Sequence, residues 1–241
     1  MADGAEPVAV RADARPRGLE SGRESQPLYG ALDLGTNNCR LLIAAPTSAG
    51  FRVVDSYSRI VRLGEGLTRS GRLGEAAMDR AVAALSVCGD RLRRRGVTRV
   101  QAVATQACRV AANGPEFLRR VKREAGIELR VITPREEAHL AVAGCLNLLD
   151  RRERAALVVD VGGGSTELSW VDLTDARLNG AAHVPLSRLP IRAWVSIPLG
   201  VVSLAEMFPE VEGERGREPC QVVLDGSQHA PVLVLGVLCH Q

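Results

Sequence analysis

Two short segments of the chain combine an aspartate with a glycine-containing turn between apolar stretches. Asp33 precedes a turn at residues 35–38, and Asp160 precedes a turn at residues 162–165, with Glu167 just beyond it. Glycine lets backbone N–H groups approach an anion closely, and Ser, Thr and Asn side chains add neutral donors. Each segment is therefore predicted to be a strand–turn–strand unit that binds phosphate. The pair predicts two related halves that close on a phosphorylated ligand.

The residue types in these segments indicate two kinds of ligand. Aspartate repels phosphate, so Asp33 and Asp160 suit a divalent metal that bridges to the phosphate. A tight hairpin with a bulge is the structural alternative for the second turn, but three consecutive glycines are entropically unfavourable in a simple hairpin. The first turn also suits an ordinary loop. The predicted phosphate-binding residues are Thr36, Asn37, Asn38, Gly162, Gly163, Gly164 and Ser165.

Two other polar positions admit a structural and a chemical interpretation. Thr133 and Glu136 can form a capping box at a helix start, which leaves Glu137 available as a general base on water. Arg109 follows an expected strand over 97–105, where its planar guanidinium would suit phosphate oxygens at the ligand-binding end of the sheet. Spacing alone leaves both interpretations open for Glu137, and for Arg109 it favours an ordinary surface ion pair.

The elements that must position these residues follow from the hydrophobic pattern. Apolar residues at helical spacing predict a long helix that ends at Gly96. A loop is expected over 64–71. Because the glycine-rich turn at 162–165 joins two strands, it is not the dinucleotide-binding fingerprint, which opens a helix. The order of predicted strands and helices along the chain indicates an α/β fold. Strands are expected over 29–34, 39–45, 51–63, 97–105, 127–132, 156–161, 167–172 and 193–199. Helices are expected over 75–95, 115–125 and 135–150.

Composition narrows the class of protein. The 241 residues are 46% apolar and only 3% aromatic, so the core must consist of Ala, Val and Leu, and no apolar stretch is long enough for a membrane helix. The net charge of +3 does not by itself imply nucleic-acid binding. Basic clusters at 91–95, 119–123 and 151–154 are interpreted as solvated helix faces, with a polyanion-attracting surface as the alternative. The six cysteines lack CxxC spacing, which predicts buried, reduced thiols in a cytoplasmic protein.

Four motifs in a fixed order resemble the exopolyphosphatase and guanosine pentaphosphate phosphohydrolase family, Ppx/GppA. They are LDLGTN at 32–37, ATQACR at 104–109, REEA at 135–138 and VDVGGGSTEL at 159–168. The resemblance covers about residues 28–206. It implies the actin-like, ribonuclease-H-like fold, with two α/β domains and the site in the cleft between them. It also implies Mg²⁺-dependent hydrolysis of terminal phosphates from inorganic polyphosphate or guanosine pentaphosphate.

The resemblance also implies roles for individual residues. Glu137 matches the catalytic base of the family, and Arg109 matches its phosphate-binding arginine. Asp160 and Glu167 match carboxylates tied to metal and catalysis. These matches favour the chemical interpretation of Glu137 and Arg109, with direct attack by water on the terminal phosphorus. Asn38 stands where many family members have serine, which is a mild change because both are neutral donors.

The chain is expected to have four regions. They are a disordered leader over 1–27, actin-like domain I over 28–150, the start of actin-like domain II over 151–208, and an atypical tail over 209–241. Family members continue well past this point, so domain II is expected to be truncated or frame-shifted, with a real variant that has a rebuilt C-terminus as the alternative. An apolar run within the tail, 231–238, has no evident covering helix and would be an aggregation risk if exposed.

Three classes of function remain open from the sequence. The first is a phosphohydrolase whose partners are its polyphosphate or guanosine pentaphosphate substrate and, as in many family members, a second copy in a homodimer. The second is a kinase-like member of the same fold. The third is a non-catalytic fragment that binds phosphate. No membrane or specific nucleic-acid partner is expected.

Overall fold

The chain divides into two compact units, Met1–Pro134 and Arg135–Gln241. A computed structural model describes residues 26–48, 50–150, 152–175, 178 and 184–208 and the backbone of 233–237. The expected leader lies outside the described residues apart from its last two, and most of the expected tail also lies outside them. None of the helices in the described part of the chain combines the length and the apolar content needed to cross a membrane.

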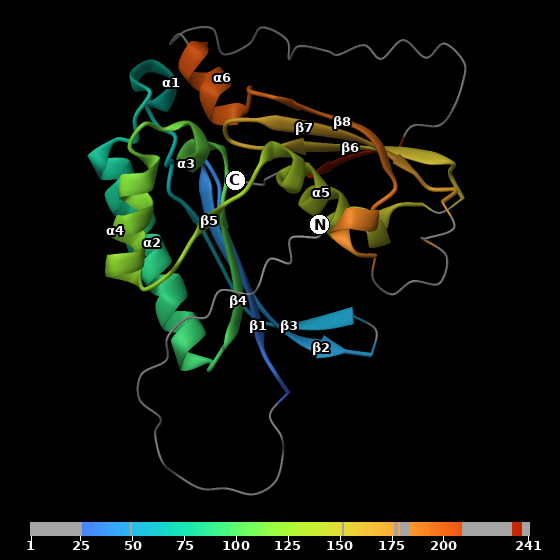
Figure 1. Cartoon of the computed structure of the whole chain (residues 1–241), viewed down its shortest axis with the longest axis horizontal. Helices are drawn as coiled ribbons and strands as arrows, with labels where there is room; N and C mark the ends of the chain where they lie inside the picture. Colours follow the sequence, from blue (N-terminus) through green and yellow to red (C-terminus); the bar gives the residue numbers. More distant parts are fainter. Residues whose placement is uncertain are drawn as a thin grey trace, which may run out of the picture. The chain divides into compact units, whose positions relative to one another are not determined.

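The first unit is built on a five-stranded sheet with the strand order β3-β2-β1-β4-β5 (Figure 1). β1 is antiparallel to β2 and parallel to β4, and β4 is parallel to β5. The carboxyl ends of β1, β4 and β5 therefore meet at one edge of the sheet. The strands are β1 (Tyr29–Leu34), β2 (Asn38–Thr47), β3 (Gly50–Ile60), β4 (Arg99–Ala104) and β5 (Arg130–Val131).

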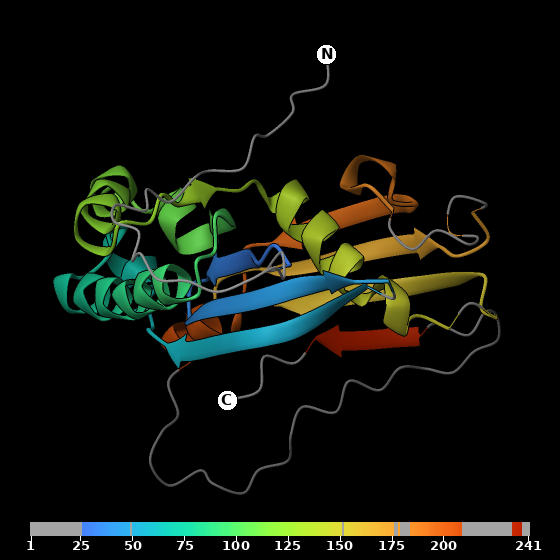
Figure 2. The same cartoon turned by 90° about the horizontal axis from the view of Figure 1, so that it is seen from below.

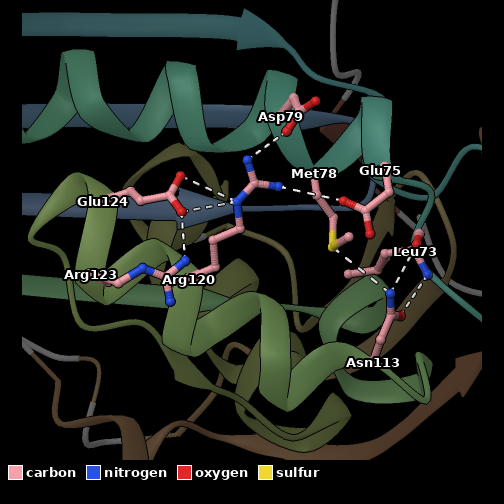
Figure 3. Close-up of polar contacts among 8 residues, drawn as sticks. All are labelled: Leu73, Glu75, Met78, Asp79, Asn113, Arg120, Arg123 and Glu124. Atoms are coloured by element: carbon pink, nitrogen blue, oxygen red, sulfur yellow. Dashed lines mark hydrogen bonds and ion pairs between the residues drawn. The ribbon is translucent and has the colours of Figure 1, made fainter.

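Two long helices, α2 (Glu75–Arg94) and α4 (Gly114–Ala125), lie side by side against this sheet (Figure 1). α2 buries an apolar stripe in the main core, and the chain leaves it at Gly96, whose φ of 65° confirms the predicted stop. Asn113, at the start of α4, bonds the backbone ahead of α2 (Figure 3). These contacts tie the start of α4 to the segment ahead of α2.

The second unit contains a four-stranded sheet with the order β8-β7-β6-β9 (Figure 2). β6 is antiparallel to β7 and parallel to β9, and β7 is antiparallel to β8. Its core includes buried residues from the end of α5 and from β6 and β7. The elements are α5 (Pro134–Cys145), β6 (Ala155–Val161), β7 (Thr166–Asp172), β8 (Ile191–Ile197), α6 (Val201–Met207), β9 (Leu233–Val237) and 3₁₀ turns at Leu146–Leu148 and Leu186–Arg188.

The two units repeat one strand pattern. In each, a hairpin (β1–β2 or β6–β7) has an antiparallel strand on one side and a parallel strand on the other. The predicted pair of related halves is thus present in the strand topology. The compact units divide earlier than the expected domain boundary at residue 150, because Val142 and Cys145 of α5 share a buried cluster with strand residues of the second sheet.

The structure departs from the predicted elements in a few places. β3 ends at Ile60 instead of residue 63, because Arg62 has a φ of 47° and the preceding backbone turns toward the first loop. The helix expected over 135–150 ends at Cys145 in a 3₁₀ turn. Part of the apolar run in the tail forms β9. Three short helices were not predicted, because one or two turns give too few positions for a helical period: α1 (Leu67–Ser70), α3 (Gln106–Val110) and α6.

Candidate phosphate site

The two predicted turns have the same backbone geometry, each within its own unit. In the first, the Gly35 N–H donates to the Asn38 carbonyl over 2.8 Å. In the second, the Gly162 N–H donates to the Ser165 carbonyl over 2.9 Å. Each turn therefore joins the antiparallel strands of a hairpin, β1–β2 or β6–β7, through four residues. The structure confirms the predicted strand–turn–strand units.

The segment that follows β3 occupies the carbonyl groups of the first turn. The N–H groups of Val61 and Arg62 donate to the Asn37 carbonyl over 2.8 and 3.0 Å, and the Gly64 N–H donates to the Thr36 carbonyl over 2.9 Å. No backbone carbonyl among the described residues accepts a hydrogen bond from the N–H groups of Thr36 and Asn37. Turn N–H groups that lack a backbone acceptor, while the turn carbonyls are engaged elsewhere, suit an anion.

The same arrangement recurs in the second turn, with different partners. The Val201 N–H donates to the Gly162 carbonyl over 3.0 Å, and the Val202 N–H donates to the Gly163 carbonyl over 2.8 Å. No backbone carbonyl in the described part of the chain accepts a hydrogen bond from the N–H groups of Gly163–Ser165. In both turns, carbonyl groups thus accept hydrogen bonds from the segment after the third strand, while several N–H groups have no backbone acceptor.

A glycine after the third strand makes this close contact feasible in each unit. A Cβ on Gly200 would lie 2.4 Å from the Gly162 oxygen and 2.5 Å from backbone atoms of the next two residues. The backbone of Gly200 is extended, a conformation that any residue can adopt. Glycine is therefore required there because a side chain would clash, and not because of its backbone angles. A Cβ on Gly64 would lie 2.2 Å from the Thr36 Cγ2 atom. The two glycines therefore set how closely each turn is packed.

Sequence reasoning missed both glycines, although a signal was available. Each follows a leucine shortly after the third strand, as Leu63-Gly64 and Leu199-Gly200. In both halves the Leu-Gly pair follows the third strand within a few residues, and its glycine packs on the hairpin turn. Once the two hairpins had been recognised as a repeat, the pairs could have been aligned as well.

The strand register places different charges beside the two aspartates. Asp33 lies opposite Arg40 in the β1–β2 pair, whereas Asp160 lies opposite Glu167 in the β6–β7 pair. Directly opposite residues of antiparallel strands share one face of the sheet, with Cβ atoms about 5 Å apart, and like charges there are destabilising. The first aspartate thus has a basic neighbour, while the second faces another acid.

Glu167 is the more constrained member of the acidic pair. Its side chain is only 2% exposed, and its Oε1 atom accepts a 2.7 Å hydrogen bond from the Ser196 hydroxyl. Ser196 lies opposite Glu167 on β8 and orients the carboxylate. Sequence reasoning also missed this serine, because its partner is set by the pairing of β7 with β8.

The acidic pair fits a magnesium ion. Among the described residues no cluster of three or more His, Cys, Asp and Glu side chains could hold a metal. Mg²⁺ takes one or two protein carboxylates and fills its other positions with water and substrate phosphate oxygens. Asp160 and Glu167, which flank the second turn on one face, match that requirement better than Asp33, which lies opposite Arg40.

Arg109 lies at the same sheet edge as the first turn. It is on α3, directly after β4, and its Nη1 atom donates to the Ile132 carbonyl over 2.7 Å, just past β5. Since β1, β4 and β5 are parallel, their carboxyl ends lie at one edge of the sheet, and both Arg109 and the first turn lie at that edge. Glu137 belongs to the second unit, where it occupies the first turn of α5 beside Glu136. The predicted residues are therefore grouped as Asp33, Thr36, Asn37, Asn38 and Arg109 in the first unit and Glu137, Asp160, Gly162, Gly163, Gly164, Ser165 and Glu167 in the second.

Two repeated α/β halves, each with a glycine-containing hairpin turn between its first two strands, define a protein of the actin-like, ribonuclease-H-like class. The model of the Ppx/GppA phosphatase family matches residues 42–218. The chain belongs to this family. The resemblance seen in the four sequence motifs is confirmed.

Relatives and solved structures agree with this assignment. A guanosine-5'-triphosphate,3'-diphosphate pyrophosphatase from Aeromonas hydrophila is 32% identical over 160 residues, which are 66% of this chain and 32% of the relative. An exopolyphosphatase structure from Cytophaga hutchinsonii aligns with a TM-score of 0.66 and 27% identity, over 76% of this chain and 54% of that one. An Aquifex aeolicus Ppx/GppA structure aligns with a TM-score of 0.59 and 33% identity, again over 76% of this chain and 54% of that one. The chain thus spans about a third of the curated relative and about half of each solved structure.

Proposed function

We propose that this protein is a phosphohydrolase that releases terminal phosphate from inorganic polyphosphate or guanosine pentaphosphate. The observation that supports this most directly is the pair of hairpin turns, in which carbonyl groups accept hydrogen bonds from the segment after the third strand and several N–H groups have no backbone acceptor among the described residues. Family membership supports the reaction type. The two substrate classes are those for which relatives are named.

The turns and Arg109 would bind the substrate. Backbone N–H groups of Thr36, Asn37 and Gly163–Ser165 would donate to phosphate oxygens, and the Arg109 guanidinium would add charge and a planar pair of donors. Asp160 and Glu167 would hold a magnesium ion, which supplies charge neutralisation at the transferred phosphoryl group. Little covalent chemistry is then left to the protein, because phosphoryl transfer depends mainly on positioning and electrostatics.

Glu137 would act as the general base. Its carboxylate lies in the first turn of α5. It would orient a water molecule in line with the bond to the leaving group and take its proton as the bond to phosphorus forms. The neighbouring Glu136 has no assigned part in this reaction, since the capping-box interpretation accounts for it.

Phosphate release tests the proposal. The purified chain is incubated with polyphosphate, guanosine pentaphosphate or ATP in the presence of Mg²⁺, and inorganic phosphate is measured. Release from one of the first two is expected, with a loss of at least about 100-fold in Glu137→Gln, the range for a general base. Glu136→Gln is the matched control and should retain activity. Full activity in Glu137→Gln would contradict the assigned base, and preference for ATP would favour a kinase-like relative.

A cytoplasmic location is part of the same proposal. All four cysteines in the described residues are free and buried, as predicted for reduced thiols. Inorganic polyphosphate and guanosine pentaphosphate, the proposed substrates, are both water-soluble polyanions. Fractionation of cells that express the chain should place it with soluble proteins, and recovery in the membrane fraction would contradict this location.

A further inference from the structure

Two buried cysteines of the first unit face each other across the interface between the sheet and α2. Cys39 lies near the start of β2 and Cys88 lies within α2, and both are 0% exposed. Their Sγ atoms are 3.9 Å apart, and one thiol donates a hydrogen bond to the other. Cys145 of the second unit instead donates to carbonyls of its own helix. The contact of Cys39 and Cys88 is thus specific to this pair of thiols.

The pair is arranged so that one thiol activates the other. The hydrogen bond from Cys39 lowers the pKa of Cys88, and Arg91, one helical turn away, lowers it further against the effect of burial. The same interaction, with burial, raises the pKa of Cys39. Within the pair, we therefore assign Cys88, the thiol nearer Arg91, as the attacking sulfur and Cys39 as the resolving one, an arrangement found in thiol oxidation sites.

We propose that Cys39 and Cys88 form an oxidation site that reacts with a hydroperoxide and closes to an intramolecular disulfide. The Cys88 thiolate attacks one peroxide oxygen, the O–O bond breaks, and Cys88 becomes a sulfenic acid as hydroxide leaves. The Cys39 sulfur then attacks the Cys88 sulfur, the S–O bond breaks, and water leaves. Overall two thiols and one hydrogen peroxide give one disulfide and two waters.

The geometry requires only a small movement. A disulfide has an S–S distance of about 2.05 Å, so the sulfurs must approach by about 1.9 Å, which side-chain rotation provides more readily than a backbone shift. Hydrogen peroxide is close to water in size, and brief local opening of the core would admit it. A bulkier oxidant would react far more slowly at side chains with no exposed surface.

The disulfide would act on the first phosphate turn. Cys39 follows Asn38 directly and pairs with Leu34, so it belongs to the last residue pair below the turn. Linking it to Cys88 ties the base of the turn to α2 and closes a loop between residues 49 positions apart. Such a link restricts the unfolded chain and should raise the Tm by about 5 °C or more. Oxidation would therefore stabilise the first unit.

Mapping of the disulfide tests the proposal on the unmodified chain, so that no variant needs to fold. The protein is treated with hydrogen peroxide, its remaining thiols are alkylated under denaturing conditions, and its peptides are analysed by mass spectrometry. The expected result is a Cys39–Cys88 crosslink that disappears with dithiothreitol, together with a raised Tm. Recovery of both as free thiols, as separate sulfinic acids or in disulfides with other cysteines would overturn the proposal. An unchanged or lower Tm of the crosslinked chain would overturn the stabilising role.

Matched variants separate this chemistry from general oxidation. Cys88→Ser should abolish the crosslink and leave Cys39 alkylatable, whereas Cys145→Ser, which alters a buried thiol of the other unit, should leave the crosslink intact. Loss of the crosslink in both variants would contradict a specific pair. The readout is independent of phosphate release, so its outcome does not depend on the proposed hydrolase activity.

Discussion

The two halves share a backbone but differ in charge at the same position. In the first half the aspartate before the turn lies opposite Arg40, and in the second half the aspartate lies opposite Glu167. The turns themselves are closed by equivalent hydrogen bonds. The same turn is thus combined with two different charge environments, and only the second half has the acidic pair on which the proposed cation site depends.

The two halves also differ in what surrounds the glycine that packs on each turn. Gly200 approaches backbone atoms of the second turn, whereas Gly64 approaches a side-chain methyl group of Thr36. Backbone atoms of a hydrogen-bonded turn cannot move without breaking it, but a methyl group can be removed by substitution. The second turn is therefore the less adaptable of the two.

Gly200→Ala is the substitution expected to have the largest effect. Its Cβ would lie 2.4–2.5 Å from three backbone atoms of the second turn. Separation of α6 from the turn should cost about 3 kcal/mol and expose the amides of the second unit. Thermal unfolding and peptide-resolved hydrogen exchange over 155–207 measure both effects. A Gly200→Ala protein as stable as the wild type would contradict the packing comparison.

In the first half, the destabilisation caused by Gly64→Ala should be relieved by a second substitution at Thr36. Gly64→Ala places a Cβ 2.2 Å from the Thr36 Cγ2 atom, and Thr36→Ser removes that atom. The double variant Gly64→Ala/Thr36→Ser should recover most of the stability lost in Gly64→Ala. Equal stability of the single and double variants would show that the methyl contact is not the cause.

Magnesium should stabilise the second half through Glu167 and leave the first half unaffected. An ion that binds only the folded state adds about 2.7 kcal/mol at 100 times its Kd. Glu167→Gln removes the charge opposite Asp160, so it should abolish the rise in Tm with Mg²⁺ and, without Mg²⁺, be at least as stable as the wild type. Asp33→Asn is the matched variant and should keep the response. The reverse pattern would place the ion at Asp33.

Asn113→Ala should destabilise the first unit alone. The Asn113 Oδ1 atom accepts from the Leu73 N–H over 2.8 Å, and its Nδ2 atom donates to the Leu73 carbonyl over 3.0 Å (Figure 3). Truncation leaves two buried backbone groups without partners, which should cost about 2 kcal/mol. Asn113→Asp keeps the acceptor and should be intermediate at neutral pH. Hydrogen exchange that increases equally in both units would contradict a local effect.

Asp172→Asn should have the smallest effect, and it should depend on pH. Hydrogen bonds from the Thr174 hydroxyl and from Arg192 lower the pKa of Asp172 from 3.8 to about 2. A folded pKa below the unfolded one contributes stability above about pH 4, and that stability is lost as the pH falls toward 2. The Tm of the variant should thus be lower than that of the wild type at pH 7, and the two should converge near pH 2. A difference in Tm between variant and wild type that stays constant from pH 7 to pH 2 would show that ionisation of Asp172 is not the cause.

The local parts of the fold and site could be predicted from the sequence, and the non-local contacts could not. The hairpins at 35–38 and 162–165 follow from aspartate, glycine and flanking apolar residues, because turn chemistry is encoded within a few residues. The pairing of Asp160 with Glu167 could also be predicted. A four-residue turn at 162–165 makes Val161 pair with Thr166, and the next pair outward is then Asp160 with Glu167. The contact of Ser196 with Glu167 depends on how β8 pairs with β7, which no local pattern specifies.

Hydrogen exchange at the two turns tests most directly the claim that both halves bind phosphate. The Glu137→Gln chain, which would not consume the probe, is compared with and without tripolyphosphate in the presence of Mg²⁺. Slower exchange is expected both in peptides that contain Gly35–Asn38 and in peptides that contain Gly162–Ser165, because N–H groups without a backbone acceptor gain phosphate oxygens as acceptors. Protection of only one turn, or of neither, would contradict it.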